Sequence, residues 1–259
     1  MDKTKNLLEV RNLTVHYETD EGICEAVNDI SFDIHPGEIL GVVGESGSGK
    51  STMMQSLYFD KDVTSGEVFI KQYENGEKNV LEESSQQKRY IKNNLLGKVY
   101  QNPILGLKMD FSCIGNIAEK LIAANNRNVK NMTNIAEELL KKVNIPLFRM
   151  YEAPKNFSGG MQQRVQIAKA LSNNPPILLL DEVTTGLDLS VQANVLDLIK
   201  MLQRERGISM ISHDLGVIKM LCDRTIVMLN GKIVEEGLTD QILEDPQHEY
   251  TQQLVQSLL

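Results

Sequence analysis

One eight-residue run, Gly44–Ser51 (GESGSGKS), narrows the possible folds of this chain more than any other segment. It satisfies the phosphate-binding pattern G-x-x-x-x-G-K-[ST] at every fixed position. Glycines in such a loop allow successive backbone N–H groups to turn toward one cluster of phosphate oxygens, and the helix that follows adds positive potential. Lys50 is therefore expected to reach the β- and γ-phosphates of a nucleotide, and the Ser51 hydroxyl to bind Mg²⁺.

Strand and helix patterns alternate around this loop. The apolar run Ile39–Val43 precedes it and the helical pattern Lys50–Leu57 follows it, which favours a phosphate loop over a flexible Gly/Ser linker. Alternation of this kind predicts a parallel sheet with helices on its faces. The other expected strands are Val10–Tyr17, Ile30–Ile34, Gly66–Ile70, Gly97–Tyr100, Ile177–Leu180, Ile208–Ile211, Thr225–Leu229 and Lys232–Val234, and the other helices are Met161–Leu171, Val191–Leu202 and Asp214–Leu221.

The stretch from Asp110 to Phe157 has a different pattern. Its apolar residues recur at three- and four-residue intervals, which is helix spacing, and the polar stretch Asn125–Asn134 separates two such helices. We therefore expect a helical insertion into the α/β sheet. The last stretch, Ile233–Leu259, has six acidic residues and no Lys or Arg, and is expected to be a solvated end.

Composition argues against several classes of function. The net charge of −8 disfavours a protein held mainly by nucleic-acid phosphates or by anionic lipid. The longest run of large aliphatic residues, Ile177–Leu180, is far shorter than the ~20 residues of a membrane span, and the N-terminus lacks the apolar block of a signal peptide. The three cysteines are far apart in sequence and lack Cys-x-x-Cys spacing, which is typical of the reduced thiols of cytosolic proteins. We expect a cytoplasmic protein that neither binds nucleic acid nor inserts into a membrane.

Two of the expected strands end in polar residues. Asp181 and Glu182 follow Ile177–Leu180, at the end where open α/β sheets bind ligands. Asp181 is placed to hold Mg²⁺ through its water shell, and Glu182 to orient and deprotonate an attacking water. Strands often end in acidic residues, so this pair indicates a catalytic site only in combination with the phosphate loop. His213 follows Ile208–Ile211 and is a candidate γ-phosphate contact, with a structural strand-end histidine as the alternative.

A second glycine turn, Phe157–Arg164 (FSGGMQQR), opens another helix. Its bare N–H groups and the Ser158 hydroxyl offer a further phosphate cradle. One nucleotide does not need two such cradles within one subunit, so we infer that this one serves a nucleotide bound to a partner chain. The alternative is an ordinary N-capped helix.

With these motifs in this order, the chain resembles the ATP-binding subunits of the ABC superfamily, and the resemblance covers essentially all 259 residues. It includes a glutamine loop around Gln101 and a Gly186–Asp188 loop before the strand that ends at His213. The resemblance implies a homodimer in which two subunits pack head to tail and trap two ATP molecules. Each nucleotide then lies between the phosphate loop of one chain and the Ser-Gly-Gly signature of the other.

The resemblance also implies roles for single residues. Gln101 would touch Mg²⁺ and sense the partner domain, and Tyr17 would stack on adenine. Ser158 and Gly160 would bind the γ-phosphate in trans, and Asp188 would lie at the dimer seam. The expected nucleotide contacts are Tyr17, Gly44, Glu45, Ser46, Gly47, Ser48, Gly49, Lys50, Ser51, Thr52, Gln101, Ser158, Gly159, Gly160 and Gln163; the expected Mg²⁺ ligands are Ser51, Gln101 and Asp181; the expected catalytic residues are Glu182 and His213.

In fold, the resemblance implies a single α/β P-loop ATPase domain over residues 1–259. Residues 1–109 and 158–259 would form the catalytic core, with a mostly parallel sheet and an N-terminal antiparallel β subdomain, and residues 110–157 the helical subdomain. The chain departs from the family at Val183, where Pro is usual after the catalytic glutamate. This departure leaves a non-hydrolysing, ATP-gated scaffold as one alternative function.

Several stretches look like the dipeptide, oligopeptide and nickel importer branch of the superfamily. They are Gly44–Ser51, Ser158–Arg164, Leu187–Ala193 and Asp245–Thr251, the last with Glu249 where Pro is usual. The glutamine loop Val99–Lys108 (VYQNPILGLK) instead lacks the Ser-Leu-Asn-Pro of those importers. Together with Gly115–Leu121 it is similar to the ATP-binding components of phosphonate C–P lyase systems, which belong to this branch but are not transporters.

The glutamine loop abuts the partner that an ABC ATPase drives, so a different loop implies a different partner surface. The chain also ends soon after Tyr250, where oligopeptide-type ATPases usually continue, although nickel-type subunits can be equally short. We therefore expect a Mg·ATP-hydrolysing dimer that acts on the C–P lyase core complex. The alternative partner is a set of ABC permease subunits for peptides or nickel, which would make the protein membrane-peripheral.

Overall fold

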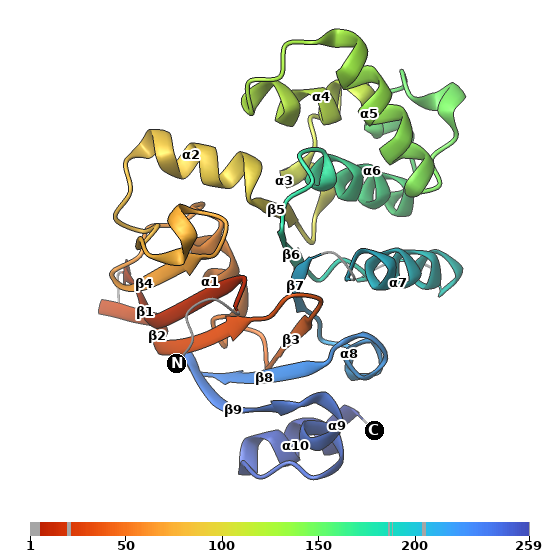
Figure 1. The fold of residues 1–259 in the computed structure, drawn as a ribbon. Helices are drawn as coiled ribbons and strands as arrows, with labels where there is room; N and C mark the ends of the chain where they lie inside the picture. Colours follow the sequence, from red (N-terminus) through yellow and green to blue (C-terminus); the bar gives the residue numbers. More distant parts are fainter. Residues whose placement is uncertain (1–5, 20–21, 186, 188, 204–205, 259) are drawn as a thin grey trace.

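The computed structural model describes residues 6–19, 22–185, 187, 189–203 and 206–258 (Figure 1). Its larger sheet has six strands in the order β5-β6-β7-β3-β8-β9. All neighbouring pairs are parallel except β8 and β9, which form the expected hairpin. The bounds are β3 Ile39–Val43, β5 Leu96–Val99, β6 Ile177–Asp181, β7 Gly207–Ile211, β8 Arg224–Leu229 and β9 Lys232–Leu238. The mostly parallel core sheet of an α/β protein is thereby confirmed.

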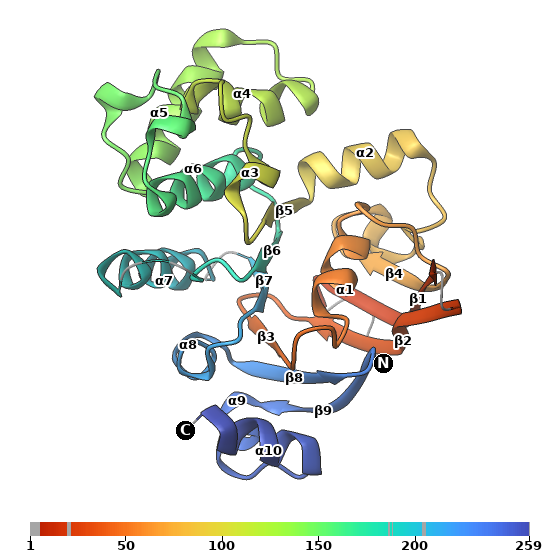
Figure 2. The same cartoon turned by 180° about the vertical axis from the view of Figure 1, so that it is seen from behind.

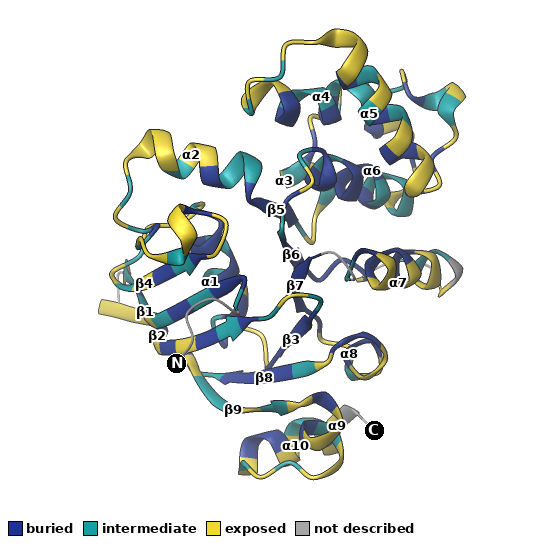
Figure 3. Cartoon of the chain, in the orientation of Figure 1, coloured by how far each residue is buried: buried dark blue, intermediate teal, exposed yellow. Residues whose placement is uncertain are grey.

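The inner strands of this sheet are buried on both faces. In β3, Ile39 and Val43 belong to one hydrophobic cluster, whereas Leu40 and Val42 belong to a second cluster. Successive side chains of a strand point to opposite faces, so a continuous apolar run lets one strand serve two cores. Figure 3 shows these strands as mostly buried (dark blue). The site described below therefore rests on a sheet that is packed from both sides.

The smaller sheet is the antiparallel β subdomain expected from the family resemblance. Its order is β2-β1-β4, with bounds β1 Leu8–Thr19, β2 Gly22–Ile34 and β4 Ser65–Ile70, and both pairs are antiparallel. Strand β2 begins well before the expected Ile30. Its first four residues, Gly22–Glu25, are exposed and show no apolar alternation, so no strand could be predicted there.

Helices cover the large sheet and extend beyond it. The expected helices are present as α1 Lys50–Leu57, α4 Cys113–Ala123, α5 Val129–Lys142, α6 Gly159–Leu171, α7 Leu189–Gln203 and α8 Leu215–Leu221. Figures 1 and 2 both show α4 and α5 beyond α6, far from the small sheet. One short helix, α3 Pro103–Gly106, lies within the glutamine loop, and the 3₁₀ turns are η1 Glu74–Gly76, η2 Leu147–Arg149 and η3 Pro154–Asn156.

Besides α3, three helices of the described residues were not expected from the sequence. Helix α2 (Ser85–Asn94) buries only Ile91, so it has almost no apolar periodicity. Helices α9 (Thr239–Glu244) and α10 (Glu249–Leu258) lie in the stretch expected to be a solvated end. That expectation was wrong in part, because Ile242 and Tyr250 in these helices are buried against the core.

Candidate functional site

The order of the large sheet gathers the predicted residues at one edge. Strands β5, β6, β7 and β3 are parallel neighbours, so their carboxyl ends lie together. The phosphate loop follows β3, and Asp181 is the last residue of β6. Gln101 comes just after β5, and His213 just after β7. Residues between Gly44 and His213 in the sequence thus meet at one place, because the crossover connections put their strands side by side.

Two glycines allow the phosphate loop to fit between the sheets. Gly44 has a φ of 145° and Gly49 a φ of 102°, a region that side-chain-bearing residues rarely adopt. A Cβ at Gly44 would collide with the carbonyl oxygen of Met228 in β8, and one at Gly49 with that of Ala26 in β2. Any other residue at either position would have to displace backbone, so both glycines are needed for this loop.

The Lys50 side chain forms hydrogen bonds with the backbone of the phosphate loop. Its Nζ donates to the carbonyl oxygens of Gly44 (2.8 Å) and Glu45 (2.7 Å), and the residue is only 4% exposed. Burial lowers the pKa of Lys50, while the negative charges of Glu182, Asp181 and Glu45 act in the opposite direction. An ammonium group bound to neutral carbonyl oxygens gains from exchanging them for charged phosphate oxygens. The geometry therefore suits the phosphate contact predicted for Lys50.

Ser51, in α1, and Asp181, at the end of β6, lie next to each other. The Ser51 hydroxyl donates to Oδ1 of Asp181 at 3.3 Å. Burial raises the pKa of Asp181 and so does the neighbouring Glu182, whereas the positive charges of Lys98 and Lys50 and the Ser51 hydrogen bond lower it. A divalent cation beside this carboxyl would favour its charged form.

Glu182 is held between two predicted partners. One carboxylate oxygen accepts from Nε2 of Gln101 at 2.6 Å, and the other lies 2.6 Å from Nε2 of His213. Glu182 is 8% exposed and has a φ of 48°, in the left-handed region. Backbone in this region is costly for a residue other than glycine, asparagine or aspartate, and such strain clusters at functional sites. The contacts with Gln101 and His213 hold the carboxylate in one position at the cavity, and its role as a general base stays a prediction.

One cavity of about 560 Å³ is lined by most of the charged and polar residues described above, whereas Asp181 contacts Ser51 but does not line it. The lining residues that the sequence had predicted as site residues are Ser46, Gly47, Gly49, Lys50, Ser51, Thr52, Gln101, Glu182 and His213. The lining residues that it had not predicted as site residues are Cys24, Glu25, Ala26, Asn230 and Gly231. Gly231 contacts the phosphate loop directly, since its N–H donates to the carbonyl oxygen of Ser48 at 3.1 Å. The sequence predicted a hairpin turn at Asn230-Gly231, but no pattern in it predicted that Cys24, Glu25 and Ala26 of β2 would line the cavity.

Three phosphate-loop residues do not line the cavity, namely Gly44, Glu45 and Ser48. They support the loop instead. Glu45 N–H donates to the phenol oxygen of Tyr250, in the last helix, at 2.8 Å. Ser48 is 4% exposed and lies 3.3 Å from Nζ of Lys50. Direct nucleotide contacts of these three side chains or backbone groups stay predictions.

Tyr17 lies outside the residues that line this cavity. It is the cross-strand partner of Cys24, which does line it, so the ring lies one strand away. Its phenol oxygen accepts from Lys61 Nζ at 3.0 Å, and it lines a neighbouring cavity with Phe59 and Lys61. Stacking of Tyr17 on adenine stays a prediction.

The second glycine turn lies apart from the phosphate loop of the same chain. Ser158 caps α6 by accepting from the N–H of Met161, and Ser158 and Gly159 are exposed while Gly160 is half-buried. None of the three lines the nucleotide cavity. A helix N-terminus that lies outside the cavity of its own chain is what a phosphate cradle acting on a partner subunit requires, and that role stays a prediction.

Gln163 and Asp188 complete the predicted set. Gln163 is 3% exposed, and its amide is directed within the chain toward the carbonyl oxygen of Tyr100 and the side chain of Gln166. Its proposed nucleotide contact therefore stays a prediction without support from this geometry. Asp188, expected at a dimer seam, lies outside the described residues.

The donor set fits a magnesium ion shared with phosphates. Among the described residues, no group of three or more His, Cys, Asp or Glu side chains could hold a metal by itself. Mg²⁺ in nucleotide sites keeps several waters and takes only one or two protein ligands besides phosphate oxygens. Asp181 and the Ser51 hydroxyl offer that number, and the oxygen of the Gln101 amide is a third candidate.

The comparisons with known proteins agree with this geometry. The family model described as ABC transporter matches residues 27–185, and the chain belongs to this family as an ATP-binding cassette. A solved dimer of the ATP-binding cassette MJ0796, in a post-hydrolysis state bound to ADP and Pi, superposes with a TM-score of 0.81 at 29% identity, covering 90% of this chain and 98% of that one.

Two curated relatives match nearly the whole chain. The phosphonates utilization ATP-binding protein PhnK of Escherichia coli (strain K12) is 44% identical over 98% of both chains. The oligopeptide transport ATP-binding protein OppF of Bacillus subtilis (strain 168) is 39% identical, over 98% of this chain and 83% of the relative. No helix among the described residues is long and apolar enough to cross a membrane.

Proposed function

We propose that this chain is a Mg·ATP-hydrolysing cassette that works as a homodimer and drives the C–P lyase core complex during phosphonate breakdown. The observation that carries the partner assignment is the 44% identity to a phosphonates utilization protein along 98% of both chains. The glutamine loop supports it, because Val99–Lys108 differs from importer loops where the partner would dock.

The cavity suggests how its residues hydrolyse ATP. Lys50 and the N–H groups of the loop bind the phosphate oxygens. Asp181 and Ser51 would hold Mg²⁺, which would supply further neutralisation of the phosphate charge. Glu182 accepts a proton from the attacking water, and His213, 2.6 Å from the Glu182 carboxylate, orients that carboxylate and contacts the γ-phosphate. Catalysis is then mostly positioning and charge neutralisation.

The exposed Ser158–Gly160 turn supports a composite site. Each turn binds the γ-phosphate held by the other chain, so two ATP molecules close the dimer and hydrolysis reopens it. Gln101 connects this cycle to a partner, because it contacts Glu182 at one end and leads into α3 at the other. In and after α3, Ile104, Leu105 and Phe111 are 61%, 70% and 54% exposed, an apolar surface suited to docking.

The second candidate is an ATP-binding subunit of a dipeptide, oligopeptide or nickel importer. The 39% identity to an oligopeptide transport protein favours it. Both proposed functions use the same ATP cycle and differ in the partner protein that would bind at α3. The test must therefore identify the partner and not the ATPase activity.

Tagged Glu182→Gln protein, loaded with ATP, is used to isolate partners from its native cells grown on a phosphonate. Soluble and membrane fractions are analysed separately by mass spectrometry. Lys50→Ala, which loses its phosphate contact, is the matched control for capture that depends on ATP. C–P lyase core subunits in the soluble fraction support the proposal. Multi-span permeases in the membrane fraction contradict it and establish the importer.

A further inference from the structure

A second cavity, separate from the nucleotide cavity, lies behind the glutamine loop. It has a volume of about 170 Å³ and is bordered by β5, α2, α3, α4 and α6. Its lining residues are Tyr58, Lys92, Lys98, Tyr100, Leu105, Gly106, Lys120, Gln166, Lys169 and Ala170. Four of these ten are lysines, and none is acidic. No role in ATP hydrolysis accounts for this composition.

Three of the lysines converge on one aromatic ring. The Nζ atoms of Lys92, Lys98 and Lys120 lie 4.6, 5.5 and 5.5 Å from the centre of the Tyr58 ring. They come from α2, β5 and α4, so three separate elements each bring a positive charge to the same point. Attraction to the ring offsets part of the repulsion between them, but it supplies no negative charge.

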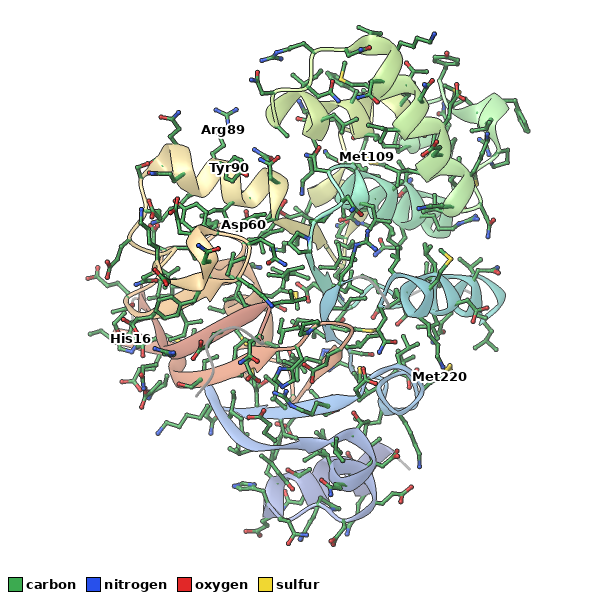
Figure 4. All side chains as sticks on the ribbon, in the orientation of Figure 1. His16, Asp60, Arg89, Tyr90, Met109 and Met220 are labelled. Carbon is green, nitrogen blue, oxygen red and sulfur yellow. The ribbon has the colours of Figure 1, made fainter. Side chains whose placement is uncertain are left out.

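The carboxylates nearby do not balance these charges. Asp60, labelled below α2 in Figure 4, accepts from both Lys92 (2.6 Å) and Lys98 (2.8 Å). Glu119 is likewise shared between Lys169 (2.9 Å) and Lys108 (2.7 Å). Two carboxylates thus serve four ammonium groups, and the fifth, Lys120, has none.

Lys120 is the most unusual of the five. It is 7% exposed, and its Nζ donates to the carbonyl oxygen of Leu96 (2.8 Å) and to the Tyr58 hydroxyl (3.2 Å), both uncharged. Burial lowers its pKa to about 7, with further lowering from Lys169 and Lys92. A buried ammonium group normally has a paired negative charge.

We propose that this cavity binds a small oxyanion with two negative charges, which contacts Lys120 and Lys98 and offsets most of the excess positive charge of the lysine cluster. Five protonated lysines against two carboxylates leave three excess positive charges, of which one dianion offsets two. The Tyr100 hydroxyl already donates to Asp60 and the Gln166 amide to the carbonyl oxygen of Tyr100, so the lysines are the groups that would bind the ion. A volume of about 170 Å³ suits an ion of the size of sulfate or phosphate and is too small for a nucleotide.

The proposed site is tied to the glutamine loop. Lys169 donates to the carbonyl oxygen of Gly106, the last residue of α3, at 2.9 Å, and Gln166 accepts from the N–H of Tyr100 at 2.6 Å. Leu105 of α3 also lines the cavity. An ion among these groups holds both ends of the loop to α6, so occupancy would set the stiffness of the segment next to Gln101.

Sulfate is the probe, because it stays divalent throughout the neutral range. Calorimetric titration is done on the full chain saturated with Mg·ADP, which fills the α- and β-phosphate positions of the nucleotide cavity. A sulfate in the remaining γ-phosphate position would be unaffected by substitution of Lys120, so the variants below distinguish the two sites. The proposal expects one sulfate per chain, displaced by inorganic phosphate but not by chloride at the same ionic strength. Absence of sulfate binding, or equal displacement by chloride, overturns it.

Variants locate the site. Lys120→Met should weaken sulfate binding about tenfold or more, as expected for loss of a charged hydrogen bond, whereas Lys130→Met, at an exposed position on α5, should leave it unchanged. Retained ADP affinity shows that a variant is folded. If Lys120→Met fails this control, Lys92→Met, whose side chain is 32% exposed, replaces it. Wild-type sulfate affinity in the folded variant refutes the proposal.

Discussion

Replacing Lys120 by methionine should change how stability depends on pH. The pKa of Lys120 is about 7 in the folded chain, whereas a solvent-exposed lysine, as in the unfolded chain, has a pKa of 10.5. The unfolded chain therefore binds more protons between these values, so the free energy of unfolding rises with pH across this window. Methionine has a similar length and no charge, so Lys120→Met removes this dependence while retaining most of the packing.

The magnitude follows from the two pKa values. One pKa unit corresponds to about 1.4 kcal/mol, so a charged Lys120 at low pH costs the folded state up to about 5 kcal/mol. Between pH 7 and pH 9 the linkage relation relieves about 2 kcal/mol of this cost. Lys120 is only 7% exposed, so solvent screening reduces the figure little.

The measurement is urea unfolding of wild type and Lys120→Met at pH 7 and pH 9, in buffers without sulfate or phosphate. Wild type should gain about 2 kcal/mol on the variant as the pH rises. Lys130→Met is the control and should follow wild type. Parallel curves for wild type and Lys120→Met, within about 0.5 kcal/mol, would show that Lys120 is not held neutral by burial and would refute this reasoning.

Three further predictions concern the nucleotide cavity. Glu182→Gln keeps the size of the side chain and loses its basicity, so steady-state phosphate release should fall by about 10²–10⁴-fold while ATP still binds; a wild-type rate would remove Glu182 from catalysis. Cys24 lines the cavity and is exposed, whereas Cys113 and Cys222 are buried. A maleimide should therefore modify Cys24 alone, more slowly with Mg·ADP present, as peptide mass spectrometry would show; equal rates with and without nucleotide would contradict the cavity assignment. Tyr250→Phe removes the acceptor of a phosphate-loop N–H and should weaken ADP binding by about threefold to tenfold in calorimetry, and an unchanged affinity would make that contact incidental.

The core of the site could be predicted because its residues are consecutive in sequence. Gly44–Ser51 needs particular residue types at fixed spacing, and Asp181 and Glu182 follow an unbroken apolar strand. The parallel order of the sheet then places them together, which is a consequence of strand–helix alternation. Family resemblance added Gln101, and the structure joins it to Glu182.

What could not be predicted depends on exposed or polar elements. Helix α2 buries one side chain, and the first residues of β2 bury none, so neither has a hydrophobic period. The lysine cluster is also invisible in the sequence. Lys92, Lys98 and Lys120 each look like an ordinary surface lysine until three elements bring them to the Tyr58 ring.

The hydrogen bond between Glu45 and Tyr250 has a consequence for how the protein is made. The two residues are 205 positions apart, and β3, which leads into the phosphate loop, takes both its neighbours from residues 207–229. A ribosome synthesises the loop early and these partners late, so a nascent chain carries an unfinished nucleotide pocket for most of its synthesis. ATP can therefore stabilise this chain only after residues 207–229 and Tyr250 have been synthesised. A product truncated before these residues should fail to bind nucleotide.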